Sequence, residues 1–252
     1  MNTLETNRFT QAWRALGAQL MGADNSPRAK PKAILAVSAH WMTRGIAITA
    51  MPAPRTIHDF GGFPQALFDV RYPAPGSPAL AARVQQLLAP LNVTADQHEW
   101  GLDHGTWSVL AHLFPKADVP VVQLSLDLQQ PLTFHVELGR KLAALRDEGE
   151  LIVGSGNVVH NLGVMNWQLQ DTGFAWAERF NVAIKDAVIT RDFKQLADPT
   201  RWGQDGRLAV PTPEHYLPLL YVMGAARPQD AITLPVDGLT MGSISMLSVV
   251  VG

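Results

Sequence analysis

The sequence predicts an α/β fold, a single domain whose central sheet is mostly parallel and flanked by helices. Short apolar runs rich in Ile, Leu and Val alternate with segments of helical periodicity, a pattern typical of parallel strands covered on both faces. With 252 residues and 47% hydrophobic content, the chain can fill a sizeable core. It carries no internal repeat or linker-like tract, so we predict one domain over residues 1–252.

The N-terminal part is predicted to contribute one helix and two strands. Residues 10–20 place apolar side chains at helical spacing and predict the helix. Residues 33–39 and 46–50 are short apolar runs typical of buried strands, joined by a loop at 41–45. In this interpretation His40 closes the first strand, at the edge of an α/β sheet where ligands bind.

Residues 51–78 form the least regular segment. Pro and Gly interrupt them, yet they are too apolar for a disordered linker, so we expect an ordered functional loop. A helix is predicted over 78–88, with Ser77 as N-cap and Pro at the first helical position. A shorter helix is predicted over 107–114.

Strands and helices continue to alternate in the rest of the chain. The predicted strands are 119–124, 151–154, 232–236 and 245–250, and the predicted helices are 131–146, 174–189 and one that starts at Thr212, Pro213 and Glu214.

Composition excludes several classes of function. The 20 Lys and Arg nearly balance the 22 Asp and Glu, without runs of like charge, which argues against nucleic acid and anionic membranes as partners. Zero Cys excludes disulfides and thiolate metal sites. We find no leader pattern and no apolar stretch of membrane-spanning length, and therefore expect a cytoplasmic protein.

Four of the eight histidines stand where strands or helix starts would bring them to one end of a sheet: His40, His104, His160 and His215. Imidazole binds divalent metals and moves protons near neutral pH, so a convergent set favours metal-assisted enzyme chemistry. A structural role is the alternative for each. His160 follows a predicted strand and small residues, and His215 lies beside Glu214 near a predicted helix start.

The remaining histidines carry weaker signals. Asp103, next to His104, is also a candidate helix cap. His58 lies beside Asp59 in the ordered loop and is a candidate pocket residue, whereas we expect His98, His112 and His135 to be exposed.

Five segments together resemble one family: SAHW at 38–41, TIHDFGGFP at 56–64, YPAPGSP at 72–78, SGNVVHN at 155–161 and TPEHYLPLLY at 212–221. They resemble the class III extradiol ring-cleaving dioxygenases, in the branch of DOPA 4,5-dioxygenase-like proteins. The resemblance covers essentially the whole chain in the same order.

The resemblance implies a non-haem Fe(II) site that zinc sometimes occupies. His40 and His215 match metal ligands. His160 matches an acid/base residue that can enter the coordination sphere of zinc, and His104 matches a histidine near the substrate, where we also place His58. The implied reaction inserts both atoms of O2 beside a catechol's hydroxyls. The expected partners are thus a small aromatic catechol and O2, and nothing in the pattern fixes the native catechol or an oligomeric state.

The resemblance also implies a feature that is missing here. Family members begin with a short strand ending in His-Gly-Ser-Pro, whose His is a third metal ligand, just before the segment that matches Met1. We therefore expect that the first strand and one ligand are absent and that the true start lies upstream. In a genuinely short chain, His58 or Glu214 would be the substitute ligands.

Two other functions stay open. A non-catalytic relative would keep the fold and bind a metal or small ligand only, which the missing ligand favours. A zinc hydrolase would use Glu214 as a base, but no HExxH signature accompanies it.

Overall fold

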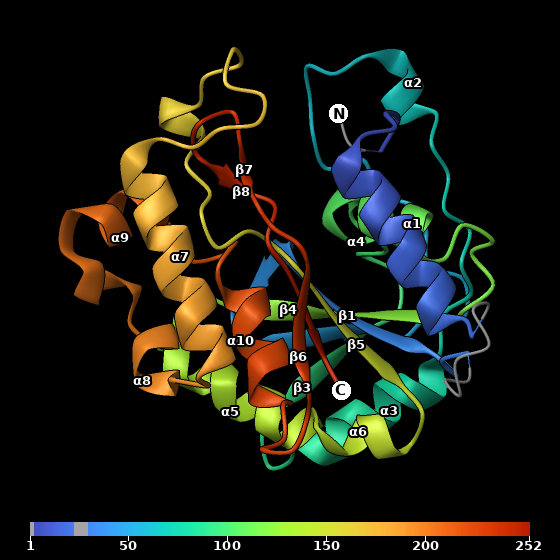
Figure 1. The fold of residues 1–252 in the computed structure, drawn as a ribbon. Coiled ribbons are helices and arrows are strands. Elements are labelled where there is room, and N and C mark those ends of the chain that lie inside the picture. Colours follow the sequence, from blue (N-terminus) through green and yellow to red (C-terminus); the bar gives the residue numbers. More distant parts are fainter. Residues whose placement is uncertain (1–2, 23–29) are drawn as a thin grey trace. The chain divides into compact units, whose positions relative to one another are not determined.

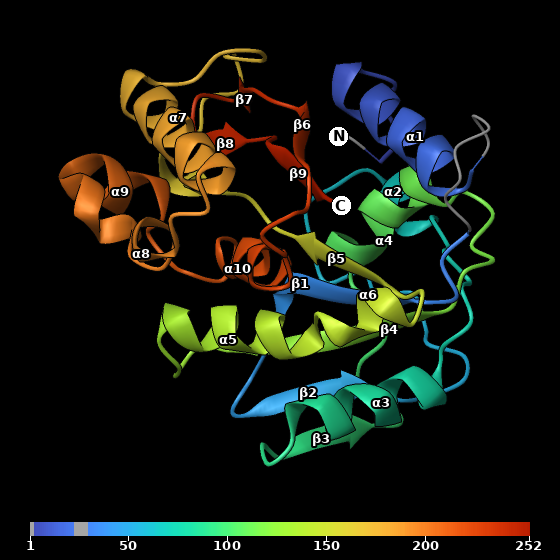
Figure 2. The same ribbon diagram turned by 60° about the horizontal axis from the view of Figure 1, so that its bottom comes forward.

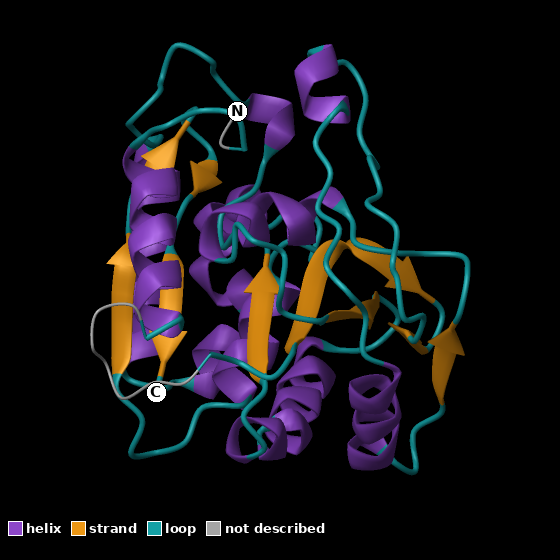
Figure 3. Cartoon of the chain, turned by 90° about the vertical axis from the view of Figure 1, so that its right-hand side faces the viewer, coloured by secondary structure: helices purple, strands orange, loops and turns teal. Residues whose placement is uncertain are grey.

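The structure of the protein, a computed structural model, describes residues 3–22 and 30–252. The chain forms two compact units: Met1–Asp127 with Lys141–Ser155 (unit 1), and Leu128–Arg140 with Gly156–Gly252 (unit 2). Helices and strands both occur throughout (Figure 3). The predicted α/β class is confirmed, whereas the single catalytic domain stays a prediction. The expected absence of the family's first strand, which would precede Met1, stays a prediction.

Unit 1 is built on a mostly parallel sheet. Its described strands follow the order β3 (Val93–Asp96), β2 (Ile46–Thr49), β4 (Val121–Asp127), β1 (Ile34–Thr43) and β5 (Leu151–Ser155). β1 pairs in parallel with β4 and β5, and β2 with β3, whereas β2 and β4 are antiparallel. β4 is buried along its whole length, as expected of a strand covered on both faces.

Helices cover this sheet on both faces. In unit 1 they are α1 (Arg8–Leu20), α2 (Gln65–Phe68), α3 (Pro78–Leu88), α4 (His104–Leu113) and α6 (Ala144–Asp147). Figure 1 shows α1 and α4 on one side of the sheet, and α3 and α6 on the other. α1 begins with a capping box between Asn7 and Thr10. α3 begins as predicted, with the Ser77 hydroxyl accepting the Leu80 N–H and Pro78 in the first turn.

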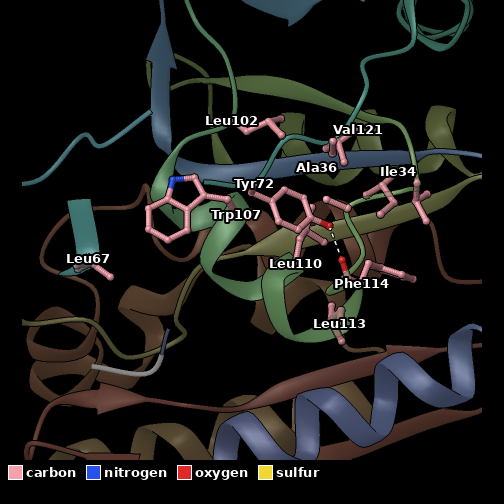
Figure 4. Close-up of a cluster of buried hydrophobic side chains, with 13 residues drawn as sticks. Ile34, Ala36, Leu67, Tyr72, Leu102, Trp107, Leu110, Leu113, Phe114 and Val121 are labelled. Atoms are coloured by element: carbon pink, nitrogen blue, oxygen red, sulfur yellow. Dashed lines mark hydrogen bonds between the residues drawn. The ribbon is translucent and has the colours of Figure 1, made fainter. Parts of the chain in front are cut away.

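The core of unit 1 lies between α4 and the sheet (Figure 4). Trp107 and Leu110 of α4 are completely buried in it. Tyr72, from the long loop after β2, donates its hydroxyl to the carbonyl of Phe114 at 3.0 Å. This bond lets a polar ring end lie in an apolar core, because the buried hydroxyl has a partner.

Unit 2 is mainly helical with small antiparallel sheets. Its elements are most of α5 (Leu132–Leu142), α7 (Ala175–Ile189), α8 (Phe193–Leu196), α9 (Gly203–Ala209), α10 (Leu217–Gly224), the short 3-10 helices Leu162–Val164 and Pro199–Trp202, and the strands β6 (Ile232–Val236), β7 (Leu239–Thr240), β8 (Ile244–Ser245) and β9 (Ser248–Val251). β6 pairs with β9, and β7 with β8. Figure 2 shows α8 and α9 beside α7.

Several predicted boundaries are wrong. β1 does not end at His40 but runs on to Thr43, because Met42 and Thr43 pair with β4 after a register shift. The helix predicted over 131–146 is divided at Ala143, which keeps helical dihedrals, into α5 (Leu132–Leu142) and α6 (Ala144–Asp147).

Two further boundaries differ near the C-terminus. The strand predicted at 245–250 is divided between β8 and β9, which pair with different strands. α10 starts at Leu217, because the residues before it form a turn in which Pro213 accepts the N–H groups of Tyr216 and Leu217.

Candidate functional site

His40 lies inside β1, in the stretch between Val37 and Met42 where the pairing with β4 changes register. Such irregularities re-aim side chains and are frequent next to active sites. The backbone N–H of His40 donates to the Ser38 hydroxyl at 3.2 Å. The side chain is one-quarter exposed, so the imidazole is held at the surface of the sheet and not in the core.

His104 lies directly against His40. It is the first residue of α4, and Asp103 caps this helix by accepting the N–H of Thr106 at 3.0 Å, as predicted. The centroids of the two imidazoles are 3.9 Å apart, with 46° between the ring planes. The resemblance placed these residues in one site, and unit 1 brings them into contact.

Asp59, from the loop between β2 and α2, lies beside both histidines. One carboxylate oxygen, Oδ1, accepts the backbone N–H of His104 at 2.9 Å. The other, Oδ2, is 2.9 Å from Nδ1 of His104 and 3.7 Å from Nδ1 of His40. Burial acts to raise the pKa of the Asp59 carboxyl, but the contacts with His104 outweigh it and the pKa lies below its usual value.

His40, Asp59 and His104 together offer two imidazoles and a carboxylate as metal ligands. Their ligating atoms lie within 4.8 Å of one another. Nitrogen and carboxylate donors in this ratio suit Fe(II) and also Zn(II). The donor set in unit 1 therefore fits a non-haem divalent metal.

A buried network of hydrogen-bonded polar side chains lies next to the cluster of His40, Asp59 and His104. The Asp103 carboxylate accepts from the side-chain amide of Gln123, whose oxygen accepts the Thr106 hydroxyl at 2.9 Å. Burial raises the pKa of Asp103 despite these bonds and one from Ser38. Since Ser38 also accepts from His40, the network links β1, β4 and the start of α4 in one geometry.

An aromatic pocket of about 200 Å³ opens beside His104. Its walls include Phe60, Phe63, Leu67 and Trp107. The Phe60 ring stands edge-on to His104, with centroids 5.3 Å apart. A cavity of ~150 Å³ is enough for benzene, so this pocket has room for one substituted ring. Trp107 closes the inner wall and extends into the core shown in Figure 4.

Unit 2 brings the other two predicted histidines together. His160 and His215 stack with ring centroids 3.4 Å apart and 8° between the planes. His160 is fixed by its N–H, which donates to Ala209 at 2.9 Å, and by a bridge to Ile244. The prediction placed His215 in the first turn of a helix. In the structure it lies in the turn before α10.

Asn157 orients His215 through two bonds to that residue and a third to Ser245 that fixes its own side chain. Its N–H donates to the His215 carbonyl at 2.8 Å, and its side-chain amide donates to the Ser245 carbonyl at 2.7 Å. The amide oxygen then faces Nδ1 of His215 at 3.2 Å, where it can accept a hydrogen bond from an Nδ1–H group. This arrangement favours Nε2 of His215 as the lone-pair nitrogen that a metal requires.

The other predicted residues lie elsewhere. Nε2 of His58 is 3.0 Å from the Val70 carbonyl, and its ring packs behind the pocket wall, with its centroid 5.5 Å from that of Trp107. Its substrate contact stays a prediction. His98 is exposed as expected. His112 and His135 are buried, contrary to expectation, because both are on the inner faces of their helices.

Asp59 and Asn157 were not singled out by the sequence. Each stands next to a residue that was noticed: Asp59 follows His58, and Asn157 lies in the Gly-Ser-Gly-Asn run where β5 ends. Both residues lie inside segments that resemble the family, at 56–64 and 155–161, and their polar side chains were the signal that could have identified them.

Comparison with known proteins shows the relatives of this chain. Residues 22–251 match the family described as the catalytic LigB subunit of aromatic ring-opening dioxygenase. The 4,5-DOPA dioxygenase extradiol of Escherichia coli K12 is 53% identical over 254 residues, covering 100% of this chain and 91% of that protein. The protein of the same name from Beta vulgaris is 38% identical, covering 88% of this chain and 80% of its own.

One solved structure is similar over nearly the whole chain. It is a crystal structure of an uncharacterized protein from Escherichia coli K12, 47% identical, with a TM-score of 0.83. The match covers 98% of this chain and 93% of the other. The fold is thus shared with a solved protein over nearly its whole length.

Proposed function

The chain belongs to the LigB family of aromatic ring-opening dioxygenases, in the DOPA 4,5-dioxygenase-like branch of the extradiol enzymes, and on this premise we propose that its substrate is a DOPA-like catechol and its metal Fe(II). The reaction would add both atoms of O2 while breaking the ring bond beside the two hydroxyls. A dioxygenase from Hapsidospora irregularis, 31% identical, also belongs among the relatives.

One observation carries this proposal. A cluster of two imidazoles and a carboxylate, in which His40 is the proposed metal ligand, borders a pocket walled by aromatic side chains. Aromatic walls favour a flat ring, and the pocket volume suits one ring with hydroxyl groups. Metal donors and a ring-shaped recess at one place are the two requirements of metal-dependent ring opening.

Fe(II) fits the donors of unit 1, and His40 would be its ligand there. When bound, Fe(II) would hold the catechol oxygens and O2 next to each other, which is why positions must stay open around it. Zn(II) fits the same donor types and is the proposed alternative occupant. The assignment of His40 and His215 to one metal, which His160 would join when that metal is Zn(II), stays a prediction that single substitutions test.

The chain's own residues have distinct proposed roles. His160 takes a proton from a catechol hydroxyl and later returns it. Its stacked contact with His215 and its backbone bond to Ala209 keep the ring in one place. His104 faces the ring substrate in the aromatic pocket, and His58 supports the pocket wall.

The experiment is anaerobic loading with Fe(II), followed by a panel of catechols and then O2. We expect a yellow ring-fission product from wild type and from His98→Ala, an exposed histidine that serves as the matched control. His40→Ala and His215→Ala should lose both metal and colour. His160→Ala should keep the metal and lose the colour. Metal binding without colour would favour the non-catalytic relative.

Cellular location and partners follow the same proposal. None of the helices in residues 3–22 and 30–252 combines the length and apolar character needed to cross a membrane. A cytoplasmic location stays a prediction. We propose no partner beyond the catechol and O2.

A further inference from the structure

We propose that Asp59 is a positioning residue that holds His104 with its proton on Nδ1, so that Nε2 accepts a hydrogen bond from a hydroxyl of the ring substrate. This inference rests on the proposed function and deepens it, because it assigns a task to a carboxylate that could otherwise be counted as a third metal ligand.

The geometry of Asp59 favours the role of partner over that of ligand. Both oxygens are directed at His104, Oδ1 at the backbone N–H and Oδ2 at Nδ1, each at 2.9 Å. The distance from Oδ2 to Nδ1 of His40 is longer, 3.7 Å. A carboxylate that holds both the backbone and the ring of one histidine fixes the ring's direction and its tautomer.

The tautomer decides what His104 can do at the pocket. Nδ1 of His104 is buried and makes no well-aligned hydrogen bond in this geometry, but the acceptor it faces is Oδ2 of Asp59, at 2.9 Å; the residue also lines the aromatic pocket. With the proton on Nδ1, the other ring nitrogen is an acceptor. A catechol hydroxyl is a donor, so an acceptor beside a ring-shaped recess orients the two hydroxyls. If Asp59 coordinated the metal instead, it would not determine which ring nitrogen of His104 carries the proton.

Asp59→Asn is the most informative variant. The amide has one acceptor and one donor group, whereas His104 presents two N–H donors to the carboxylate. If the amide oxygen keeps the backbone N–H, its NH2 group faces Nδ1, and the imidazole must move its proton to Nε2. Nε2 then becomes a donor opposite a donor, and the hydroxyl loses its acceptor.

The test compares holoenzymes of wild type, Asp59→Asn, Asp59→Glu and the control Asp69→Asn. Asp69 is an exposed carboxylate directly after α2, and its side chain accepts from the side-chain amide of Gln65 at 2.9 Å. Four quantities are measured: metal per chain, kcat and KM for a catechol, anaerobic binding of 4-nitrocatechol, and the nitrogen-15 NMR shifts of the His104 ring in the zinc-loaded protein.

We expect Asp59→Asn to keep the metal content of wild type and to shift the His104 proton from Nδ1 to Nε2. Turnover should fall about 10- to 100-fold, the usual cost of losing an orienting partner, and 4-nitrocatechol should bind more weakly. Asp59→Glu should restore part of both, and Asp69→Asn should match wild type.

Loss of metal in folded Asp59→Asn would make Asp59 a ligand and overturn the proposal. So would a wild-type His104 that carries its proton on Nε2, a result that needs no variant to fold. Unchanged turnover and tautomer in Asp59→Asn would overturn it too. If wild type opens no catechol, the proposed function fails by itself, while the NMR and 4-nitrocatechol measurements still decide the role of Asp59.

Discussion

Replacing Gly105 by Ala should displace the site without touching any ligand. A Cβ at this position would lie 2.5 Å from Oγ of Ser38 and 2.7 Å from Cδ2 of His40. Ordinary contact begins near 3.4 Å, so the His40 ring would have to move by 3.4 − 2.7 = 0.7 Å. Ser38 cannot turn away cheaply, because its hydroxyl accepts the N–H of His40.

The free-energy change combines two opposing effects. Ala is favoured over Gly in a helix by up to ~1 kcal/mol, whereas overpacking a well-packed position costs about 1–3 kcal/mol. We therefore expect a net loss of about 1 kcal/mol, seen as a fall in Tm of roughly 2–4 °C. Metal affinity should fall more clearly than stability, since a ligand moved by a fraction of an ångström no longer meets its ion.

The assay is a thermal unfolding curve together with a metal titration of the apoprotein. Gly61→Ala is the matched control, because a Cβ at Gly61 meets nothing within 4 Å and its backbone is not in the left-handed region. If Gly105→Ala and Gly61→Ala gave the same Tm and the same metal affinity, the contact between α4 and His40 would not control the site.

Three other substitutions test separate parts of the structure. Gly224→Ala should destabilise unit 2 by about 1–3 kcal/mol in urea unfolding, because its Cβ would collide with the backbone of α5 at Val136, and a wild-type midpoint would argue against this helix contact. Gln123→Leu should cost about 1–3 kcal/mol in the same assay, since it removes the amide that donates to the buried Asp103, whose pKa should rise further; an unchanged midpoint would count against the network. The pKa of Asp59 is lowered on folding, so its stabilising effect is present above the unfolded value of 3.8 and is lost as pH falls through the folded value. The stability difference between wild type and Asp59→Asn should thus shrink on acidification below about pH 4, and a difference that is constant between pH 6 and pH 3 would show that the carboxylate is not coupled to folding.

The elements with strong local patterns were predictable from the sequence. The helix at 78–88 has its cap, its Pro and its apolar spacing within one continuous segment, and the structure has the same bounds. The buried strands β1, β4 and β5 could be found as apolar runs. β3 was missed because its sequence, VTAD, buries only one of its four residues fully. Its strand character comes from pairing with β2, which local pattern does not reveal.

The site was predictable only in part. Histidines near strand ends were visible, and the structure brings His40 to His104 and His160 to His215. The register shift around His40 depends on how β1 pairs with β4, so the strand end could not be placed. The approach of Asp59 to His104 depends on the path of a loop between residues 45 positions apart, and spacing alone does not specify it.

The most direct measurement supplies the Fe(II)-loaded protein with a catechol and dioxygen carrying the heavy oxygen isotope, and weighs the product by mass spectrometry. An extradiol dioxygenase places one labelled oxygen in the new carboxylate and the other in the aldehyde, before the aldehyde exchanges with water. We predict this doubly labelled ring-opened product from wild type and none from His40→Ala. A product that takes its new oxygen from water, or an intact ring with O2 unconsumed, would contradict the assignment of ring-opening chemistry to this chain.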